Sequence, residues 1–251
     1  MPPINNHTVA IILAAGNGSR FGSDTPKVLH PIQGVPMLHR IIQSVRSAGV
    51  SEVCVVVGAH HKAIRASCDG FSITYAMQDQ PLGTGHALRC ALISLRDQPA
   101  DQYLVLPGDC PMIQPQTLCR MMETAANVSG VTLLTSTLPD AGAYGRIIRN
   151  QRGDVTAIQE SKDCTHLERS IQEFNSGIYC FDRHQLEQGI QTLTTNNAQA
   201  EYYLTDVIAY FFRKEIPISS VTTPHHWEVC GVNTPDELAN LTNMVRSTIT
   251  E

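Results

Sequence analysis

The residues most suited to chemistry form a loop of small side chains that carries cations. The run Leu13-Ala-Ala-Gly-Asn-Gly-Ser-Arg20 follows an apolar stretch, and Pro26-Lys27 comes shortly after it. Glycine and alanine let backbone N–H groups approach an anion with no large side chain in the way. The guanidinium of Arg20 and the ammonium of Lys27 suit a triphosphate. We therefore predict a phosphate-binding loop here rather than a mere tight turn.

Two widespread phosphate motifs do not describe this loop. No Gly-Lys-Ser/Thr run follows it, so it is not a Walker loop. Phe21 stands where the dinucleotide fingerprint G-x-G-x-x-G requires its last glycine. A dehydrogenase that binds a dinucleotide is therefore disfavoured.

Two later segments offer groups for a base and for a metal ion. Gln78 offers a paired donor and acceptor, and Gly83 and Thr84 add backbone and hydroxyl groups that can read the edge of a base. Taken alone, an N-cap threonine after a turn explains this segment better. Gly108-Asp109 follows an apolar run, where a carboxylate can bind Mg2+ beside a triphosphate. Without the first loop, a turn aspartate would be the preferred interpretation.

The first half of the chain alternates apolar runs with segments of helical period. The apolar runs are continuous, as in a parallel sheet covered on both faces, and ligands bind such sheets beyond the carboxyl ends of the strands. The sequence therefore predicts an α/β fold with a doubly wound, mostly parallel sheet. The predicted strands are 9–13, 52–57, 72–76 and 103–106, and the predicted helices are 36–48, 60–68 and 84–95.

The pattern changes after about residue 130, where strands follow one another with few helices between them. We expect a mixed, partly antiparallel lobe that covers the ligand crevice. The chain shows no repeat or linker, so one domain over residues 1–251 is predicted, with a nucleotide-binding half at about 8–130 and a sugar-binding lobe with C-terminal helices at about 131–251. The predicted strands are 131–137, 145–149, 155–159 and 177–181, and the predicted helices are 200–212 and 235–245.

Composition excludes several classes of protein. The 251 residues carry 18 Lys and Arg against 23 Asp and Glu, a net charge of −5, with no long basic run to grip nucleic-acid phosphates. No apolar stretch approaches the ~20 residues that cross a bilayer, and the N-terminus lacks a signal-peptide pattern. The eight cysteines are scattered without a C-x-x-C pair, which argues against disulfides or a zinc site. We expect a cytoplasmic protein without nucleic-acid or membrane partners.

Longer motifs resemble a known family. The loop 13–20 with Pro26-Lys27 is similar to the signature of nucleotidyltransferases that join an NTP to a sugar phosphate, which have a Rossmann-like fold. Together the motifs resemble the N-terminal uridylyltransferase domain of the GlmU family, along most of the chain from about residue 9 to 246. The narrower matches are Leu82-Gly-Thr-Gly-His-Ala87, Tyr144-Gly-Arg-Ile147, Asn175-Ser-Gly-Ile178, Asn197-Ala-Gln-Ala-Glu-Tyr-Tyr-Leu-Thr-Asp206 and Gly231-Val-Asn233.

The resemblance implies roles for individual residues. Arg20, Lys27 and Asp109 would be catalytic, and Asp109 and Asn233 would bind Mg2+. The sugar would contact Gly145, Glu160, Asn175, Tyr202 and Thr205. The nucleotide would contact Leu13, Ala14, Ala15, Gly16, Gly18, Gln78, Gly83, Thr84 and Gly108.

The implied reaction joins UTP and N-acetylglucosamine-1-phosphate into UDP-N-acetylglucosamine and pyrophosphate, for peptidoglycan and cell-envelope precursors. Pro107 replaces the family's usual Tyr before Gly-Asp, and Ser161 replaces a His, which leaves another sugar-1-phosphate open. The acetyltransferase half of the family, a β-helix that builds a trimer, has no counterpart in this sequence, so acetyl transfer and a trimer are not expected. A monomer or weak oligomer is predicted.

Two other interpretations stay open. A cytidylyltransferase of isoprenoid synthesis is disfavoured by the runs 82–86 and 201–206. A non-catalytic nucleotide-sugar sensor would have little need for the metal pair Asp109 and Asn233, or for the cations Arg20 and Lys27.

Overall fold

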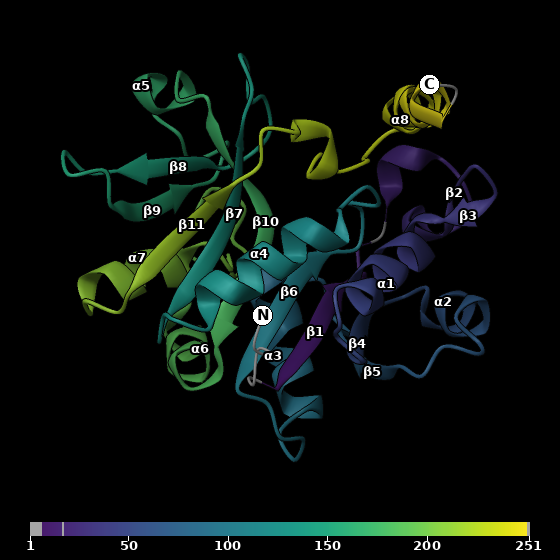
Figure 1. The fold of residues 1–251 in the computed structure, drawn as a ribbon, viewed down its shortest axis with the longest axis horizontal. Coiled ribbons are helices and arrows are strands. Elements are labelled where there is room, and N and C mark those ends of the chain that lie inside the picture. Colours follow the sequence, from purple (N-terminus) through teal and green to yellow (C-terminus); the bar gives the residue numbers. More distant parts are fainter. Residues whose placement is uncertain (1–6, 17, 250–251) are drawn as a thin grey trace.

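One mixed β-sheet runs through both halves of the chain. The computed structural model describes residues 7–16 and 18–249. Nine strands of these residues form the sheet, in the order β11-β7-β10-β6-β1-β4-β5, with β8 paired to β10 and β9 to β8 (Figure 1). The strands are β1 (Thr8–Leu13), β4 (Glu52–Val57), β5 (Thr74–Met77), β6 (Gln102–Pro107), β7 (Val131–Thr137), β8 (Arg146–Arg149), β9 (Val155–Gln159), β10 (Glu173–Asp182) and β11 (Ile218–Thr222).

The part of the sheet formed by the first half of the chain is parallel, and the rest is mixed. Strand β1 lies between β4 and β6 and is parallel to both, and β5 continues the parallel order beyond β4. Strand β10 runs antiparallel to β6, β7 and β8, whereas β11 is parallel to β7. The predicted mostly parallel sheet with a partly antiparallel extension is confirmed.

Helices cover both faces of the sheet, as the continuous apolar strands require (Figure 1). Ala10 and Ile12 of β1 pack with helices α1 and α4 on one face. Val9 and Ile11 pack with α3 and α7 on the other, and all four residues are at most 1% exposed. The helices are α1 (Met37–Ser47), α2 (His61–Ser67), α3 (Thr84–Ser94), α4 (Pro115–Ala125), α5 (His166–Arg169), α6 (Arg183–Gly189), α7 (Asp206–Arg213) and α8 (Pro235–Ile249).

The remaining elements are short. The small sheet of β2 and β3 and the 3-10 turns connect the larger elements. They are β2 (Pro31–Ile32), β3 (Val35–Pro36), η1 (Ser19–Phe21), η2 (Lys27–Leu29), η3 (Ile190–Thr192) and η4 (His226–Glu228). No helix in the described ranges has both the length and the apolar character needed to cross a bilayer.

The structure corrects the predicted helix 200–212, which begins only at Asp206. The preceding residues run beside the 82–85 segment and bond to it through the backbone. Tyr202 N–H donates to Leu82 O at 2.8 Å, and Tyr202 O accepts from Gly85 N–H at 2.8 Å. These pairings hold the segment extended, and Ala200 has φ +53°, outside the helical region.

The sequence prediction missed the helices α4, α5 and α6 and the strand β11, as well as the short strands β2 and β3. Helix α4 follows β6 in the first half of the chain, whereas α5 and α6 lie in the second half, which therefore contains more helix than expected. Strand β10 also begins at Glu173 rather than at Gly177, since its pairing with β7 continues across an irregularity between Asn175 and Tyr179.

Candidate functional site

A cleft of about 390 Å³ opens at the carboxyl ends of β1 and β6, the edge at which parallel sheets bind ligands. Residues of both halves of the chain line it. The predicted residues among them are Leu13, Ala14, Ala15, Gly16, Lys27, Gln78, Gly83, Thr84, Gly108, Asp109, Glu160, Asn175 and Thr205. The cleft therefore brings most predicted phosphate, base, metal and sugar residues together.

Other lining residues were not singled out from the sequence as ligand contacts. Most are apolar or glycine, and such residues carry no motif of their own. The sequence could mark them only through their neighbours in the motifs. They are Val28, Pro81, Ala87, Pro107, Gly177, Tyr179, Glu201 and Leu204.

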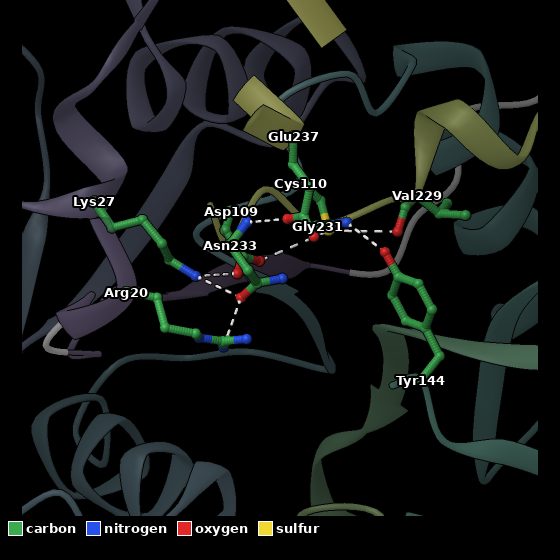
Figure 2. A network of polar contacts seen from close by, with 9 residues as sticks. All are labelled: Arg20, Lys27, Asp109, Cys110, Tyr144, Val229, Gly231, Asn233 and Glu237. Atoms are coloured by element: carbon green, nitrogen blue, oxygen red, sulfur yellow. Dashed lines mark hydrogen bonds and ion pairs between the residues drawn. The ribbon is translucent and has the colours of Figure 1, made fainter. Parts of the chain in front are cut away.

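A cluster of charged and amide groups lies at the end of the cleft where phosphate binding is predicted (Figure 2). Lys27 Nζ contacts Asp109 Oδ2 at 2.5 Å and donates to Asn233 Oδ1 at 3.2 Å. Arg20 Nη2 donates to the same Asn233 oxygen at 3.2 Å. The Lys27 and Asp109 side chains are only 14% and 20% exposed, so water screens this pair weakly. Arg20 and Asn233 thus join the cluster although neither lines the cleft wall.

Gly18 in the first loop and Gly108 after β6 allow the close approach that this cluster needs. Gly18 has φ +60°, and a β-carbon there would lie 2.7 Å from the Lys27 Cβ. Gly108 N–H donates to Leu13 O at 2.8 Å, and a β-carbon on Gly108 would lie 2.9 Å from that oxygen. The ends of β1 and β6 therefore approach closely, and Asp109 faces the loop that carries Lys27.

A short segment after η4 places Asn233 next to Asp109. Val232 N–H donates to Asp109 O at 2.9 Å. Asn233 N–H donates to Glu237 Oε2 at 2.6 Å, and Glu237 N–H donates to the Thr234 hydroxyl at 3.2 Å. The start of α8 thus fixes the Asn233 backbone, in the manner of a helix N-terminal capping box.

The donor set at Asp109 and Asn233 fits a divalent cation. The Lys27 ammonium already lies between Asp109 Oδ2 and Asn233 Oδ1, which shows that both oxygens can contact one cation. Among the described residues, no group of three or more His, Cys, Asp or Glu side chains gathers to hold a metal. Mg2+ commonly takes one or two protein oxygens and completes its shell with phosphate and water. The pair therefore fits a metal that arrives with a triphosphate.

The neighbouring cysteine is not arranged as a nucleophile. Cys110 is 3% exposed, and its thiol donates to Val229 O at 3.6 Å. Burial, with a smaller contribution from Asp109, raises the pKa of the Cys110 thiol well above its usual value. The thiolate is the reactive form, so this residue is a structural thiol.

The side of the cleft that is predicted to bind the base is built from two segments far apart in sequence. Gln78 is 6% exposed, and its amide nitrogen donates to Gly83 O and contacts His86 Nδ1, both at 3.1 Å. Gly83, not Thr84, is the N-cap of α3. The Thr84 hydroxyl instead accepts from Leu204 N–H at 3.1 Å. The N-cap interpretation of Thr84 is therefore wrong, and its side chain ties the 201–205 segment to the cleft.

Gly83 should be hard to replace. It has φ +102°, and a β-carbon there would lie 2.7 Å from Tyr202 O. We expect Gly83→Ala to lower the free energy of unfolding in urea by about 1–3 kcal/mol. Gly70→Ala is the matched control. Gly70 also has a positive φ, +92°, but no described atom lies within 4 Å of the position that its β-carbon would take. Equal losses in the two variants would contradict the close packing of Gly83 on Tyr202.

The wall of the cleft that is predicted to bind the sugar carries a partly buried carboxyl group, that of Glu160. Glu160 Oε1 accepts from the Thr205 hydroxyl at 3.0 Å. Burial raises the pKa of Glu160, with smaller contributions from Asp206, Asp163 and Glu201, whereas the Thr205 hydrogen bond opposes it. The site thus holds an acid that keeps its proton at a higher pH than an exposed glutamate.

The raised pKa of Glu160 predicts how the stability of the fold depends on pH. Above the ordinary glutamate pKa, the folded state holds a proton that the unfolded chain has lost, so stability falls as pH rises through the folded-state pKa. Glu160→Gln removes this loss of stability at high pH. Its Tm should therefore exceed that of the unsubstituted chain by a few degrees at pH 8, and the difference should vanish near pH 4. The exposed Glu215→Gln is the control. A difference that does not depend on pH would contradict the assignment.

Of three further residues predicted to contact the sugar, Asn175 lines the cleft, whereas Gly145 and Tyr202 do not. Asn175 lines the cleft; its Nδ2 donates to the Tyr179 hydroxyl at 2.7 Å, and its N–H donates to Gly145 O at 2.9 Å. Gly145 is buried just behind the wall, where a β-carbon would lie 3.5 Å from Glu160 Oε2. The Tyr202 ring lies under the Arg89 guanidinium at 4.6 Å, and Tyr202 is not among the lining residues. Gly18 is likewise outside the lining.

Comparison with known proteins decides the family. Residues 10–169 match the MobA-like NTP transferase domain, which is more than half of the chain. The chain belongs to this family. A solved structure, a putative glucose-1-phosphate thymidylyltransferase from Bacillus anthracis in complex with a sucrose, shares the fold of this MobA-like chain with a TM-score of 0.77. It covers 95% of both chains at 20% identity.

Curated relatives confirm the predicted resemblance to GlmU. The bifunctional protein GlmU of Chromobacterium violaceum is 41% identical over 94% of this MobA-like chain and 51% of its own length. The bifunctional protein GlmU of Clostridium botulinum (strain Kyoto) is 37% identical over 97% of this chain and 53% of its own length. The chain thus spans about half the length of the curated relatives it matches.

Proposed function

We propose that this chain is a sugar-1-phosphate nucleotidyltransferase that makes UDP-N-acetylglucosamine and pyrophosphate from UTP and N-acetylglucosamine-1-phosphate. One observation carries the proposal. A phosphate loop from the first half and a polar wall from the second half face one cleft, and the Lys27, Asp109 and Asn233 side chains meet at its phosphate end. The GlmU relatives support the choice of substrates.

The two substrates would use different walls of the cleft. The loop 13–18 and Gly108 would approach the triphosphate through their backbone, and Gln78, Gly83 and Thr84 would hold the uracil. Gly145, Glu160, Asn175 and Thr205 would hold the sugar. Tyr202 would act by supporting this wall, because its ring packs on Arg89 instead of facing the cleft.

The reaction would be attack of a sugar-phosphate oxygen on the α-phosphorus of UTP, in line with the departing pyrophosphate. A phosphate dianion is already nucleophilic, so the site needs no general base. Lys27 and Arg20 would hold the phosphates and offset their negative charge. Asp109 and Asn233 would hold Mg2+, which supplies further charge neutralisation at the phosphates.

A panel assay tests the proposal. Pyrophosphate release is measured with each of the four NTPs against N-acetylglucosamine-1-phosphate, glucose-1-phosphate and galactose-1-phosphate, with and without Mg2+. We expect Mg2+-dependent release with UTP and N-acetylglucosamine-1-phosphate. Release only with another sugar phosphate would assign a different sugar, and Pro107, which lines the cleft, is the first residue to test in that case. No release with any pair would indicate a nucleotide-sugar sensor.

A further inference from the structure

Tyr144 joins the loop before β8 to the segment that carries Asn233. Its hydroxyl oxygen accepts a hydrogen bond from Gly231 N–H at 2.9 Å, across 87 positions of sequence (Figure 2). Tyr144 itself directly precedes Gly145 behind the sugar wall. One side chain thus connects the proposed sugar side of the cleft with the proposed metal side.

The buried guanidinium of Arg146 holds the loop that carries Tyr144 through hydrogen bonds. Arg146 is 2% exposed, and its guanidinium donates to backbone carbonyls instead of a carboxylate. It donates to Tyr144 O, to Gly142 O at 3.1 Å and to Ala141 O at 3.5 Å. The Tyr144 ring also packs on the fully buried Phe174, with ring centroids 4.6 Å apart. These contacts hold the Tyr144 side chain, and therefore its hydroxyl, in one position.

The segment that donates this hydrogen bond lies close to both proposed metal-binding side chains. A β-carbon on Gly231 would lie 3.4 Å from Asp109 Oδ1 and 3.6 Å from Asn233 Nδ2. The next residue, Val232, donates its N–H to Asp109 O at 2.9 Å. A shift of Gly231 would therefore change the spacing between the Asp109 and Asn233 oxygens.

We propose that Tyr144 is a positioning residue, which through Gly231 holds the Asn233 amide at the distance from Asp109 that the metal and triphosphate require. The inference rests on the proposed function. Glu237 fixes the other end of the segment, because it accepts from Asn233 N–H at 2.6 Å. Residues 231–233 are thus held at Gly231 by Tyr144, at Val232 by Asp109 and at Asn233 by Glu237.

Tyr144→Phe tests the inference, because it keeps the ring on Phe174 and removes only the hydroxyl. Tyr103→Phe is the matched control: Tyr103 is 1% exposed, and its hydroxyl has no hydrogen-bond partner among the described residues. Two quantities are compared in the full chain, namely the exchange rate of the Gly231 amide without ligand and the Kd of Mn2+ with UTP by electron paramagnetic resonance.

We expect Tyr144→Phe to speed Gly231 exchange and to weaken Mn2+ binding about three- to tenfold, the effect of one lost hydrogen bond. The control should change neither, and the Tm of Tyr144→Phe should stay close to that of the control. Unchanged exchange and unchanged Mn2+ affinity would overturn the inference. If the unsubstituted chain binds no Mn2+ with UTP, the proposed function fails, and the Tyr144 contact is then judged by Gly231 exchange alone.

Discussion

Replacing Asp109 with alanine should lower kcat by about 10²–10³-fold and leave the fold intact. Asp109 is the only carboxylate that contacts Lys27 among the described residues, and it lies on the cleft wall at the end of β6. Its removal would take away half of the protein oxygens that the proposed Mg2+ site offers. The strand below it is held by β1 and β10 and does not depend on this side chain.

The Asp109 variant needs a control for the loss of one negative charge. Asp97→Asn serves, because the Asp97 side chain is 89% exposed and does not line the cleft. The control should keep kcat within about twofold. Near-normal turnover in Asp109→Ala would contradict the assignment of Asp109 to the metal.

Replacing Lys27 with methionine should have opposite effects on turnover and on the binding of a metal alone. We expect kcat to fall about 10²–10³-fold, because a cation that offsets phosphate charge in the transition state is lost. The affinity of the free chain for Mn2+ should rise about fivefold, because the Lys27 ammonium no longer competes for Asp109 Oδ2 and Asn233 Oδ1.

Electron paramagnetic resonance of Mn2+ without nucleotide measures the second effect, and Lys62→Met on the exposed side of α2 is the control. An Mn2+ affinity that stays the same or falls in Lys27→Met would contradict the view that ammonium and metal share the same oxygens. Full turnover would contradict the role of Lys27 at the phosphates.

The position of the loop that we expect to bind phosphate could be predicted because all its parts are contiguous. Strand, small residues and cations lie within residues 9–27, so spacing alone places them at the end of a strand. Asn233 required the family resemblance, since nothing in its local sequence marks it as a neighbour of Asp109. The raised pKa of Glu160 depends on burial and on acids from other segments, which the sequence does not display.

The missed elements had weaker or overlooked signals. Helix α4 has Pro115 in its first turn and Leu118, Met121 and Met122 at helical spacing, which would have predicted it. Strand β11 is half-buried with no clear alternation, so only its pairing with β7 identifies it. The predicted helix start at Ala200 ignored the backbone pairing of Tyr202 with the 82–85 segment, a tertiary contact that overrides local preference.

The contact between Tyr144 and Gly231 is of the same kind. The sequence shows Tyr144 inside a motif, but the partner of its hydroxyl is a backbone N–H that carries no sequence signal. Such contacts between distant segments explain why the walls of the cleft could be predicted more fully than the groups behind them.

The most direct test of the proposed chemistry follows oxygen atoms through one reaction. N-acetylglucosamine-1-phosphate labelled with 18O in its phosphate is incubated with unlabelled UTP, Mg2+ and the chain, and the products are analysed by 31P NMR. Attack by the sugar phosphate on the α-phosphorus predicts UDP-N-acetylglucosamine that retains all the label, with one 18O in the bridge between the two phosphorus atoms, and an equal amount of unlabelled pyrophosphate. Label in the pyrophosphate, or no nucleotide sugar, would contradict the account.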